Sequence, residues 1–197
     1  MDTGRFAAAL DRAAPLILDG GLATQLEAQG CDISNALWSA SLLLDQPDEI
    51  VAANRAFIEA GAACIATASY QASREGFAQR GLSNARADEL IKLSVELAVK
   101  ARGDTDVLVA ASVGPYGAML HDGSEYRGDY GIAAADLRGF HAGRLRLFDQ
   151  GEADILACET VPSKPEAEVL AELLADCETP AWVSFSCPDD KHISDGT

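Results

Sequence analysis

The chain has 197 residues, 31 of them acidic and 15 basic, so its formal net charge is −16 and its sequence pI is near 4.4. This charge excludes nucleic acid and anionic membrane surfaces as expected partners, because both are bound through basic faces. Apolar residues make up 48% of the chain and charged residues 23%, the balance of a globular protein with one core.

Short apolar runs alternate with longer segments of helical period along the chain. Five runs predict strands buried on both faces, at 16–18, 64–69, 107–113, 155–158 and 182–186. Apolar spacings of three and four residues predict helices over 22–28, 48–60, 84–102, 133–150 and 165–175. This alternation predicts parallel strands with right-handed crossovers, in a single domain over residues 1–197.

Two architectures fit this order of elements, a doubly wound open sheet and a (β/α) barrel. The first strand–helix turn, at 19–24, lacks the GxGxxG phosphate fingerprint. Polar or charged residues follow each strand instead, which favours a barrel with its site at the carboxyl ends of the strands. An eight-stranded barrel takes about 250 residues, so we expect this chain to hold about five of eight units.

Asp19 and Glu159 are candidate site residues, because each carboxylate directly follows a predicted apolar strand. Gly20 and Gly21 would let backbone N–H groups approach a ligand carboxylate, while Asp19 orients an amino group. The alternative for Asp19 is a tight turn that caps the helix over 22–28. Glu159 would face the barrel mouth and hold a substrate ammonium group, or else cap the following helix.

Aromatic residues gather in the predicted loops. Five of the 12 aromatic residues lie there, at Trp38, Tyr70, Tyr116, Tyr126 and Tyr130. Aromatic faces beside carboxylates suit a cationic ligand, although loop aromatics also pin loops to a scaffold. The segment 114–131 is glycine-rich and polar, and its length is typical of a functional or a disordered loop.

Cysteine and histidine spacing predicts no local metal site. The five cysteines, at positions 31, 64, 158, 177 and 187, are scattered, and no CxxC or HxxxH pair occurs. Cys64 and Cys158 are predicted to be small core residues within strands. Scattered cysteines, no signal-peptide pattern and no long apolar run predict a cytoplasmic protein with reduced thiols.

The sequence resembles the homocysteine S-methyltransferase family, particularly the S-methylmethionine-dependent type. The matching strings are LDGGLATQLE at 18–27, LWSA at 37–40, TASYQA at 67–72, SVGPYGA at 112–118, DGSEYRGDY at 122–130, ACET at 157–160 and SDGT at 194–197. The resemblance implies a (β/α)8 barrel of the TIM type. It also implies methyl transfer from S-methylmethionine, or S-adenosylmethionine, to a zinc-bound homocysteine thiolate, giving methionine.

The resemblance also implies roles for individual residues. Asp19 and Glu159 would bind the homocysteine amino group, and the backbone of Gly20 and Gly21 its carboxylate. Tyr70, Trp38 and the segment 114–130, with Tyr116 and Tyr126, would shape the donor side. The family's three zinc-binding cysteines stand in Asn-Cys and Gly-Gly-Cys-Cys strings that this chain lacks.

These strings are expected beyond Thr197, so the chain corresponds to the N-terminal part of a family member. We therefore expect it to bind no zinc and to be inactive alone. Two alternatives stay open: a metal-free module that binds an amino acid or an onium compound, and an incomplete barrel that self-associates through its open edge.

Overall fold

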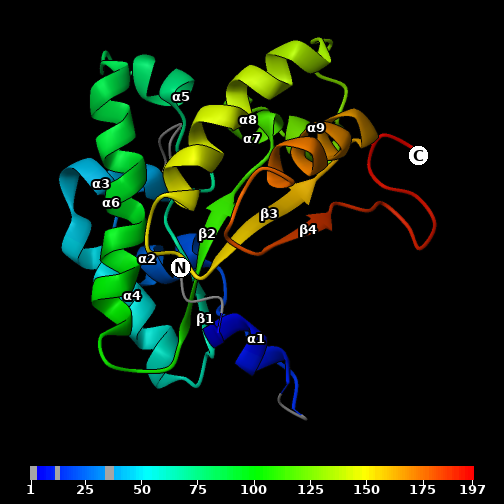
Figure 1. Ribbon diagram of the computed structural model, residues 1–197. Coiled ribbons are helices and arrows are strands. Elements are labelled where there is room, and N and C mark those ends of the chain that lie inside the picture. Colours follow the sequence, from blue (N-terminus) through cyan, green and yellow to red (C-terminus); the bar gives the residue numbers. More distant parts are fainter. Residues whose placement is uncertain (1–3, 12–13, 34–37) are drawn as a thin grey trace.

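The computed structural model describes residues 4–11, 14–33 and 38–197, the side chain of Trp38 excepted. The helices are α1 (Gly4–Leu10), α2 (Leu22–Ala28), η1 (Trp38–Ser41), α3 (Leu42–Asp45), α4 (Pro47–Glu59), α5 (Arg74–Ala78), α6 (Asn84–Arg102), α7 (Tyr116–Leu120), η2 (Ser124–Tyr126), α8 (Ala134–Asp149) and α9 (Lys164–Leu174). The strands are β1 (Cys64–Ala66), β2 (Leu108–Val113), β3 (Ile155–Val161) and β4 (Ala181–Phe185). Strands and helices alternate from β1 onward, which confirms the expected α/β class (Figure 1).

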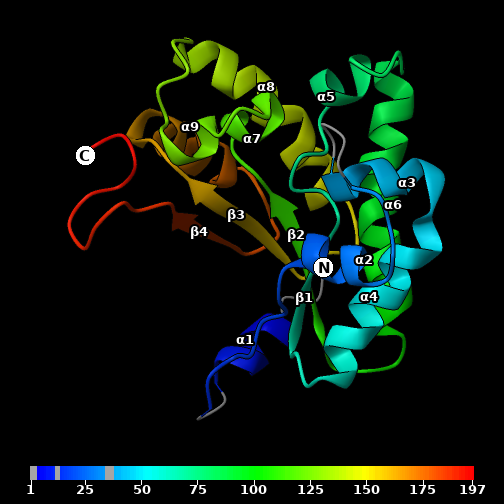
Figure 2. The same ribbon diagram turned by 180° about the vertical axis from the view of Figure 1, so that it is seen from behind.

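The four strands form one parallel sheet in the order β1-β2-β3-β4, which is also their order in the chain. Helices connect consecutive strands, as a parallel sheet requires. Contacts join α4 to α6, α6 to α8 and α8 to α9, so these helices form a continuous layer. Figures 1 and 2 show this layer covering one side of the curved sheet. The carboxyl ends of β1, β2 and β3 therefore meet at one edge of the sheet.

Alternate strand residues contribute to two different apolar clusters. The larger cluster lies between sheet and helices and contains Ile65, Val109 and Leu156 from the strands. The smaller cluster takes the intervening positions, such as Leu108 and Ile155, and packs against α1 and Trp182. Both faces of β2 are buried, as the continuous apolar run predicts.

Three of the five strand predictions are wrong in part. The strand predicted over 64–69 is β1, which ends at Ala66 because a turn follows at 68–71. The other two, at 16–18 and 182–186, fall at the edges of the sheet. Residues 16–18 form a single parallel bridge from Leu18 to Cys64 rather than a strand, and Ile17 is 56% exposed. β4 is partly exposed along its length, and Phe185 is 45% exposed. Within the described ranges β4 pairs with β3 alone, so only one of its long sides is covered.

The long helices lie where the sequence predicts them. The helix predicted over 84–102 is α6, whose N-cap Ser83 accepts a hydrogen bond from the Arg86 backbone N–H. The helix predicted over 48–60 is α4, which begins at Pro47. The seven-residue α2 lies where the sequence predicts it, over 22–28. The other short α-helices, α1, α3, α5 and α7, were not predicted, because four to seven residues are too few to show a clear period. The segment 114–131, expected as a loop, contains α7 and η2.

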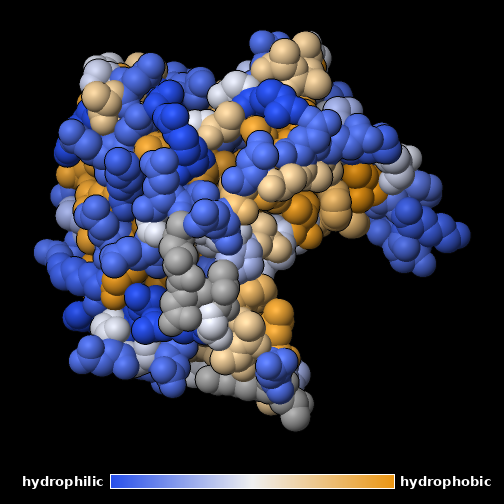
Figure 3. Space-filling model, in the orientation of Figure 1, coloured by the Kyte–Doolittle hydropathy of each residue, from blue (hydrophilic) through white to orange (hydrophobic). Residues whose placement is uncertain are grey.

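None of the helices in the described ranges is long and apolar enough to cross a membrane. Figure 3 shows apolar surface along the hollow beside the arm that carries α9 and β4.

Candidate functional site

A cavity of about 350 Å³ lies where the first strands of the sheet end. Asp19, Gly20, Gly21 and Glu159 all line it. The other lining residues are Leu18, Leu22, Ala23, Ser39, Ala66, Thr67, Tyr70, Gln71, Ser112 and Thr160. The residues predicted to bind an amino acid thus come from two distant parts of the chain, 19–21 and Glu159, to one cavity.

Asp19 is held by the strand beside it. The backbone N–H of Ala66 donates to Asp19 Oδ2 at 2.6 Å, and the Asp19 N–H donates to the carbonyl of Cys64 at 2.9 Å. Burial raises the pKa of Asp19 to about 6; the bond from Ala66 opposes this rise and the charge of Glu159 adds to it. The alternative prediction, that Asp19 caps the helix over 22–28, is wrong. Gly21 is the N-cap of α2, and no side chain forms a capping hydrogen bond there.

Glu159 owes its position to a β-bulge. Cys158 pairs with Val183 and Val161 with Phe185, so β3 has one residue more than β4 between these pairs. Thr160 takes a positive φ of 61°, a costly conformation for a β-branched residue. Such strain is found where a structure must aim a side chain. Here the strained backbone of Thr160 lies next to Glu159, whose side chain lines the cavity.

Ser112 donates a hydrogen bond to Glu159 Oε1 from the end of β2. Burial raises the pKa of Glu159, and the bond from Ser112 lowers it. Two desolvated carboxylates therefore line one cavity with raised pKa values. A cationic ligand would stabilise the ionised forms of both, since an opposite charge lowers the pKa of a carboxyl group.

Ser112 is held in place by hydrogen bonds with Thr67 and Ser69, and these contacts were not predicted from the sequence. The Ser112 backbone N–H donates to Thr67 Oγ1 at 3.0 Å, and Ser69 donates to the Ser112 carbonyl at 2.7 Å. Thr67 and Ser69 share a hydrogen bond of 2.6 Å. A signal existed: strand alternation from Leu108 places Ser112 on the same face as Ala110, toward the inner side of the sheet.

Tyr70 is the aromatic residue of the donor-side group that lines the cavity. Its hydroxyl group forms a hydrogen bond with Thr160, and burial raises its pKa. Gly114 packs against it so closely that a Cβ there would lie 2.3 Å from the Tyr70 carbonyl oxygen. Glycine at position 114 thus permits the approach of β2 to Tyr70.

Two other predicted donor-side residues, Tyr116 and Tyr126, do not line this cavity. The Tyr116 ring packs against Tyr130 at 5.3 Å and Phe140 at 5.2 Å between centroids. Tyr126 is 62% exposed, and neither tyrosine lines the cavity. Trp38 opens η1, and its side chain lies outside the described part of the chain. Their donor-side roles stay predictions.

The cysteines of this chain do not form a metal site. Cys64 and Cys158 are 2% and 0% exposed within their strands, as predicted, and burial raises the pKa of each thiol to about 12. Among the described residues, no group of three or more His, Cys, Asp or Glu could hold a metal ion. The donor set that the resemblance implies for zinc therefore does not fit the residues present.

Known proteins resemble this chain over nearly its whole length. The family profile described as homocysteine S-methyltransferase matches residues 16–197. Homocysteine S-methyltransferase YbgG of Bacillus subtilis is 46% identical over 200 residues, covering 95% of this chain and 64% of that protein. The homocysteine S-methyltransferase of Escherichia coli is 49% identical over 199 residues, covering 96% and 64%. The chain thus spans somewhat under two thirds of the length of these curated relatives.

The fold has a counterpart among solved structures. The metallated form of the homocysteine methyltransferase MmuM from Escherichia coli superposes with a TM-score of 0.92 at 48% identity, covering 98% of this chain and 70% of that chain. This match confirms a parallel α/β fold of the TIM-barrel type. The number of barrel units in this chain stays a prediction.

Proposed function

Because the chain belongs to the homocysteine S-methyltransferase family, we propose that it binds L-homocysteine for methyl transfer from a sulfonium donor. The observation that carries the proposal is the meeting of Asp19 and Glu159 in one cavity beside Gly20 and Gly21. The two carboxylates would hold the ammonium group of the amino acid. The glycine backbone would receive its carboxylate.

The electrostatics of the cavity support an ammonium ligand. Burial raises the pKa of both carboxyl groups above their ordinary values, so the site without ligand holds its charges at a free-energy cost. An ammonium group between Asp19 and Glu159 would replace lost hydration with charge-assisted hydrogen bonds. Ser112 and the Ala66 N–H orient one oxygen of each carboxylate, which leaves the other oxygen of each for a ligand.

The proposed reaction forms one S–C bond, breaks another S–C bond and releases the proton of the thiol S–H group. The homocysteine sulfur attacks the methyl carbon of the donor, and the donor S–C electron pair returns to the donor sulfur. The products are methionine, a neutral thioether and the thiol proton. The residues described here contribute positioning, which can supply much of the acceleration of a two-substrate reaction. We assign no step to a metal, because the residues present do not fit one.

The donor side is proposed to include Tyr70. Its ring lies at the cavity, and an aromatic face attracts a sulfonium group by about 0.5–2 kcal/mol. We propose S-methylmethionine as the donor, with S-adenosylmethionine as the alternative. Titration of each compound into the chain and into a Tyr70→Leu variant would separate the two. The expected result is weaker binding of the true donor to the variant.

Calorimetry with L-homocysteine tests the amino-acid site. We expect saturable binding to the 197-residue chain, and at least tenfold weaker binding by Asp19→Asn and Glu159→Gln, because each loses a charge-assisted hydrogen bond. The exposed Asp104→Asn variant is the control for net charge. The probe 4-mercaptobutanoate lacks the amino group and should bind weakly. Equal affinity for this probe and homocysteine would contradict the proposal.

The resemblance places the zinc ligands in strings that this chain lacks, so we propose that the chain alone takes up no stoichiometric zinc and forms no methionine. Metal analysis after incubation with zinc, followed by an assay for methionine, tests this. One bound zinc per chain would overturn it. Binding of homocysteine without zinc would fit the alternative of a metal-free amino-acid module.

Self-association through the sheet edge is the second alternative, and one observation favours it. Phe185 of β4 is 45% exposed beside an apolar groove that Val183, Ala167 and Ile193 also line. We propose a second copy of this chain as its occupant, because two like edges can pair. Sedimentation velocity should show a dimer that dissociates in Phe185→Asp. A concentration-independent monomer would rule this out.

A further inference from the structure

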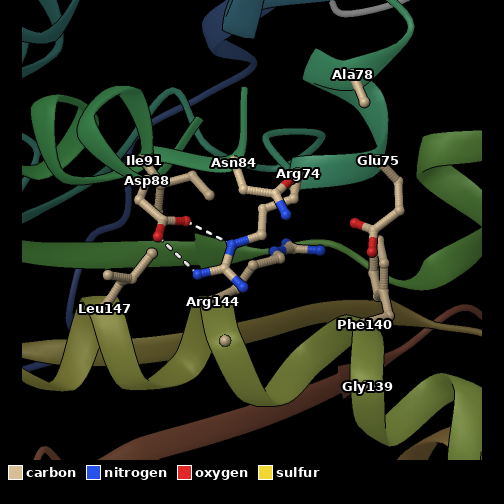
Figure 4. Close-up of a pocket in the computed structure, with 11 residues that line it drawn as sticks. Arg74, Glu75, Ala78, Asn84, Asp88, Ile91, Gly139, Phe140, Arg144 and Leu147 are labelled. Carbon is tan, nitrogen blue, oxygen red and sulfur yellow. Dashed lines mark hydrogen bonds and ion pairs between the residues drawn. The ribbon is translucent and has the colours of Figure 1, made fainter. Parts of the chain in front are cut away.

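A second cavity, of about 250 Å³, lies between α5, α6 and α8. It shares no lining residue with the cavity of Asp19 and Glu159. Its polar lining residues are Arg74, Glu75, Asn84, Asp88 and Arg144. Figure 4 shows Arg74 and Arg144 entering it from opposite sides, with Asp88 toward one end and Glu75 toward the other. Two guanidinium groups therefore face the same cavity.

Arg144 is a buried cation with few partners. Its side chain is 2% exposed, and its Nη1 and Nη2 atoms donate to the Gly114 carbonyl at 3.3 and 3.4 Å, both long for such bonds. Its Nε has no hydrogen-bond partner, and its guanidinium lies 4.8 Å from the centroid of the Phe140 ring. No ion pair within the described ranges includes Arg144, whereas buried charges are normally paired.

Arg74 leaves one guanidinium nitrogen available. Its Nε and Nη2 each donate to the Asp88 carboxylate at 2.6 Å, so Asp88 is fully engaged by Arg74. The third nitrogen, Nη1, takes no part in this pair and lies against Gly143, where a Cβ would be 3.5 Å away. Gly143 precedes Arg144 on α8, so a free guanidinium edge of Arg74 lies next to the helix turn that carries Arg144.

We propose that this cavity binds a small oxyanion, a phosphate or carboxylate group, between Arg74 and Arg144. Guanidinium groups bind planar or tetrahedral oxyanions through paired, charge-assisted hydrogen bonds. The buried Arg144 gains most, because an anion would supply the counter-charge that no carboxylate in ion-pair contact provides. The exposed amide of Asn84 adds a donor at the rim. This site is separate from the proposed homocysteine site and does not depend on it.

The charge of Glu75 should oppose anion binding in this cavity. It is exposed and lines the same cavity, so its carboxylate repels an anion there, although solvent weakens the repulsion. Removing this charge should therefore tighten anion binding. Removing the charge of Arg144 should abolish or weaken it. These opposite expectations distinguish an oxyanion site from a cavity that water merely fills.

Calorimetric titration of the chain with sodium phosphate, and separately with sodium acetate, tests the proposal at constant ionic strength set with chloride. We expect saturable binding of at least one anion, and the stronger of the two identifies the oxyanion class. Arg144→Met should weaken that binding tenfold or more, as the loss of a charge-assisted hydrogen bond predicts. Absence of saturable heat with both anions, or undiminished binding by folded Arg144→Met, would overturn the site.

Two surface variants keep the test decisive if Arg144→Met does not fold. Glu75→Gln should bind the anion about threefold more tightly, since a nearby repulsive charge is removed. Asp104→Asn removes an acidic charge that is also exposed but lies outside the cavity, and it should leave the affinity unchanged. An unchanged or weaker affinity in Glu75→Gln, or an equal increase in both variants, would contradict a local oxyanion site.

Discussion

His141 and Glu166 form a fully buried hydrogen-bonded pair, with 2.8 Å between His141 Nε2 and Glu166 Oε1. The same carboxylate accepts bonds from the Tyr116 backbone N–H at 2.6 Å and from the Tyr130 hydroxyl at 2.9 Å. Glu166 belongs to α9 and His141 to α8, whereas the two tyrosines lie between β2 and α8. One carboxylate therefore joins two helices to the segment that follows β2.

Replacing Glu166 should destabilise the protein strongly. Three groups donate to its carboxylate, and a glutamine amide in the Glu166→Gln variant would set an N–H group against at least one of them. We expect a loss of about 2–4 kcal/mol in the free energy of unfolding, measured by denaturant titration. Glu168→Gln is the matched control, because Glu168 on the same helix forms only an exposed pair with Lys164. Equal losses in both variants would contradict the role of Glu166.

His141 should make the protein less stable in acid. Burial lowers its pKa below the ordinary 6.5, the hydrogen bond that His141 donates to the Glu166 carboxylate opposes this shift, and Nδ1 has no partner. The unfolded chain therefore takes up a proton below pH 6.5 that the folded chain excludes. The His141 contribution to stability is present above pH 6.5 and is lost as the pH falls below it.

Comparison of the wild type with His141→Gln isolates this titration. The unfolding free energy of the wild type should fall relative to the variant between pH 7.5 and 5.5, by at most about 1.4 kcal/mol per pH unit. A constant difference between the two proteins across this range would show that His141 does not titrate differently in the folded state.

The predictable parts of this structure are those that short sequence patterns encode. The long apolar run 107–113 identifies β2, and Ser83 before a periodic segment identifies the start of α6. The same reasoning fails for 16–18 and β4, because an apolar run does not reveal which strand lies at a sheet edge. Edge position depends on which elements are neighbours in space.

The polar residues of the structure likewise fall into those that a local sequence pattern predicts and those that only the fold reveals. Asp19 and Glu159 were predictable as candidates, because each carboxylate directly follows an apolar run. The predicted strand ends were wrong, since β3 continues past Glu159 to Val161 and Leu18 forms only a bridge.

Ser112 was not predicted as a site residue, because it lies inside an apolar run. Glu166 was not predicted to be buried, because the leucine spacing that predicts its helix gives no sign of a buried carboxylate. His141 lies within the predicted helix over 133–150, and its buried partner Glu166 lies 25 positions away. Only the fold brings such polar pairs together.

Asp19→Asn should stabilise the protein without ligand while it weakens homocysteine binding. The folded pKa of Asp19 is about 6, above its ordinary value of 3.8. The folded state therefore holds a proton more tightly than the unfolded state. This contribution is present below pH 3.8 and is lost as the pH rises through 6, a loss of at most about 3 kcal/mol.

The asparagine variant does not titrate, and its side-chain oxygen can still accept the bond from the Ala66 N–H. Its stability relative to the wild type should therefore increase from pH 4.5 to pH 7.5, as measured by urea unfolding at each pH. A relative stability that stays flat or decreases would show that Asp19 is not desolvated in the folded chain.

Glycine substitutions at two positions should act in opposite directions. At Gly114, an alanine Cβ would lie 2.3 Å from the Tyr70 carbonyl oxygen and 2.8 Å from its ring, so the backbone of β2 or of Tyr70 must move. We expect Gly114→Ala to destabilise the protein by about 1–3 kcal/mol. Because Tyr70 lines the cavity, ligand binding should weaken as well. At Gly139 in α8, a Cβ meets nothing within 4 Å, and alanine should add about 0.5–1 kcal/mol through helix propensity. Thermal unfolding in phosphate-free buffer measures both changes. A Gly114→Ala protein as stable as Gly139→Ala would show that β2 and Tyr70 can separate freely.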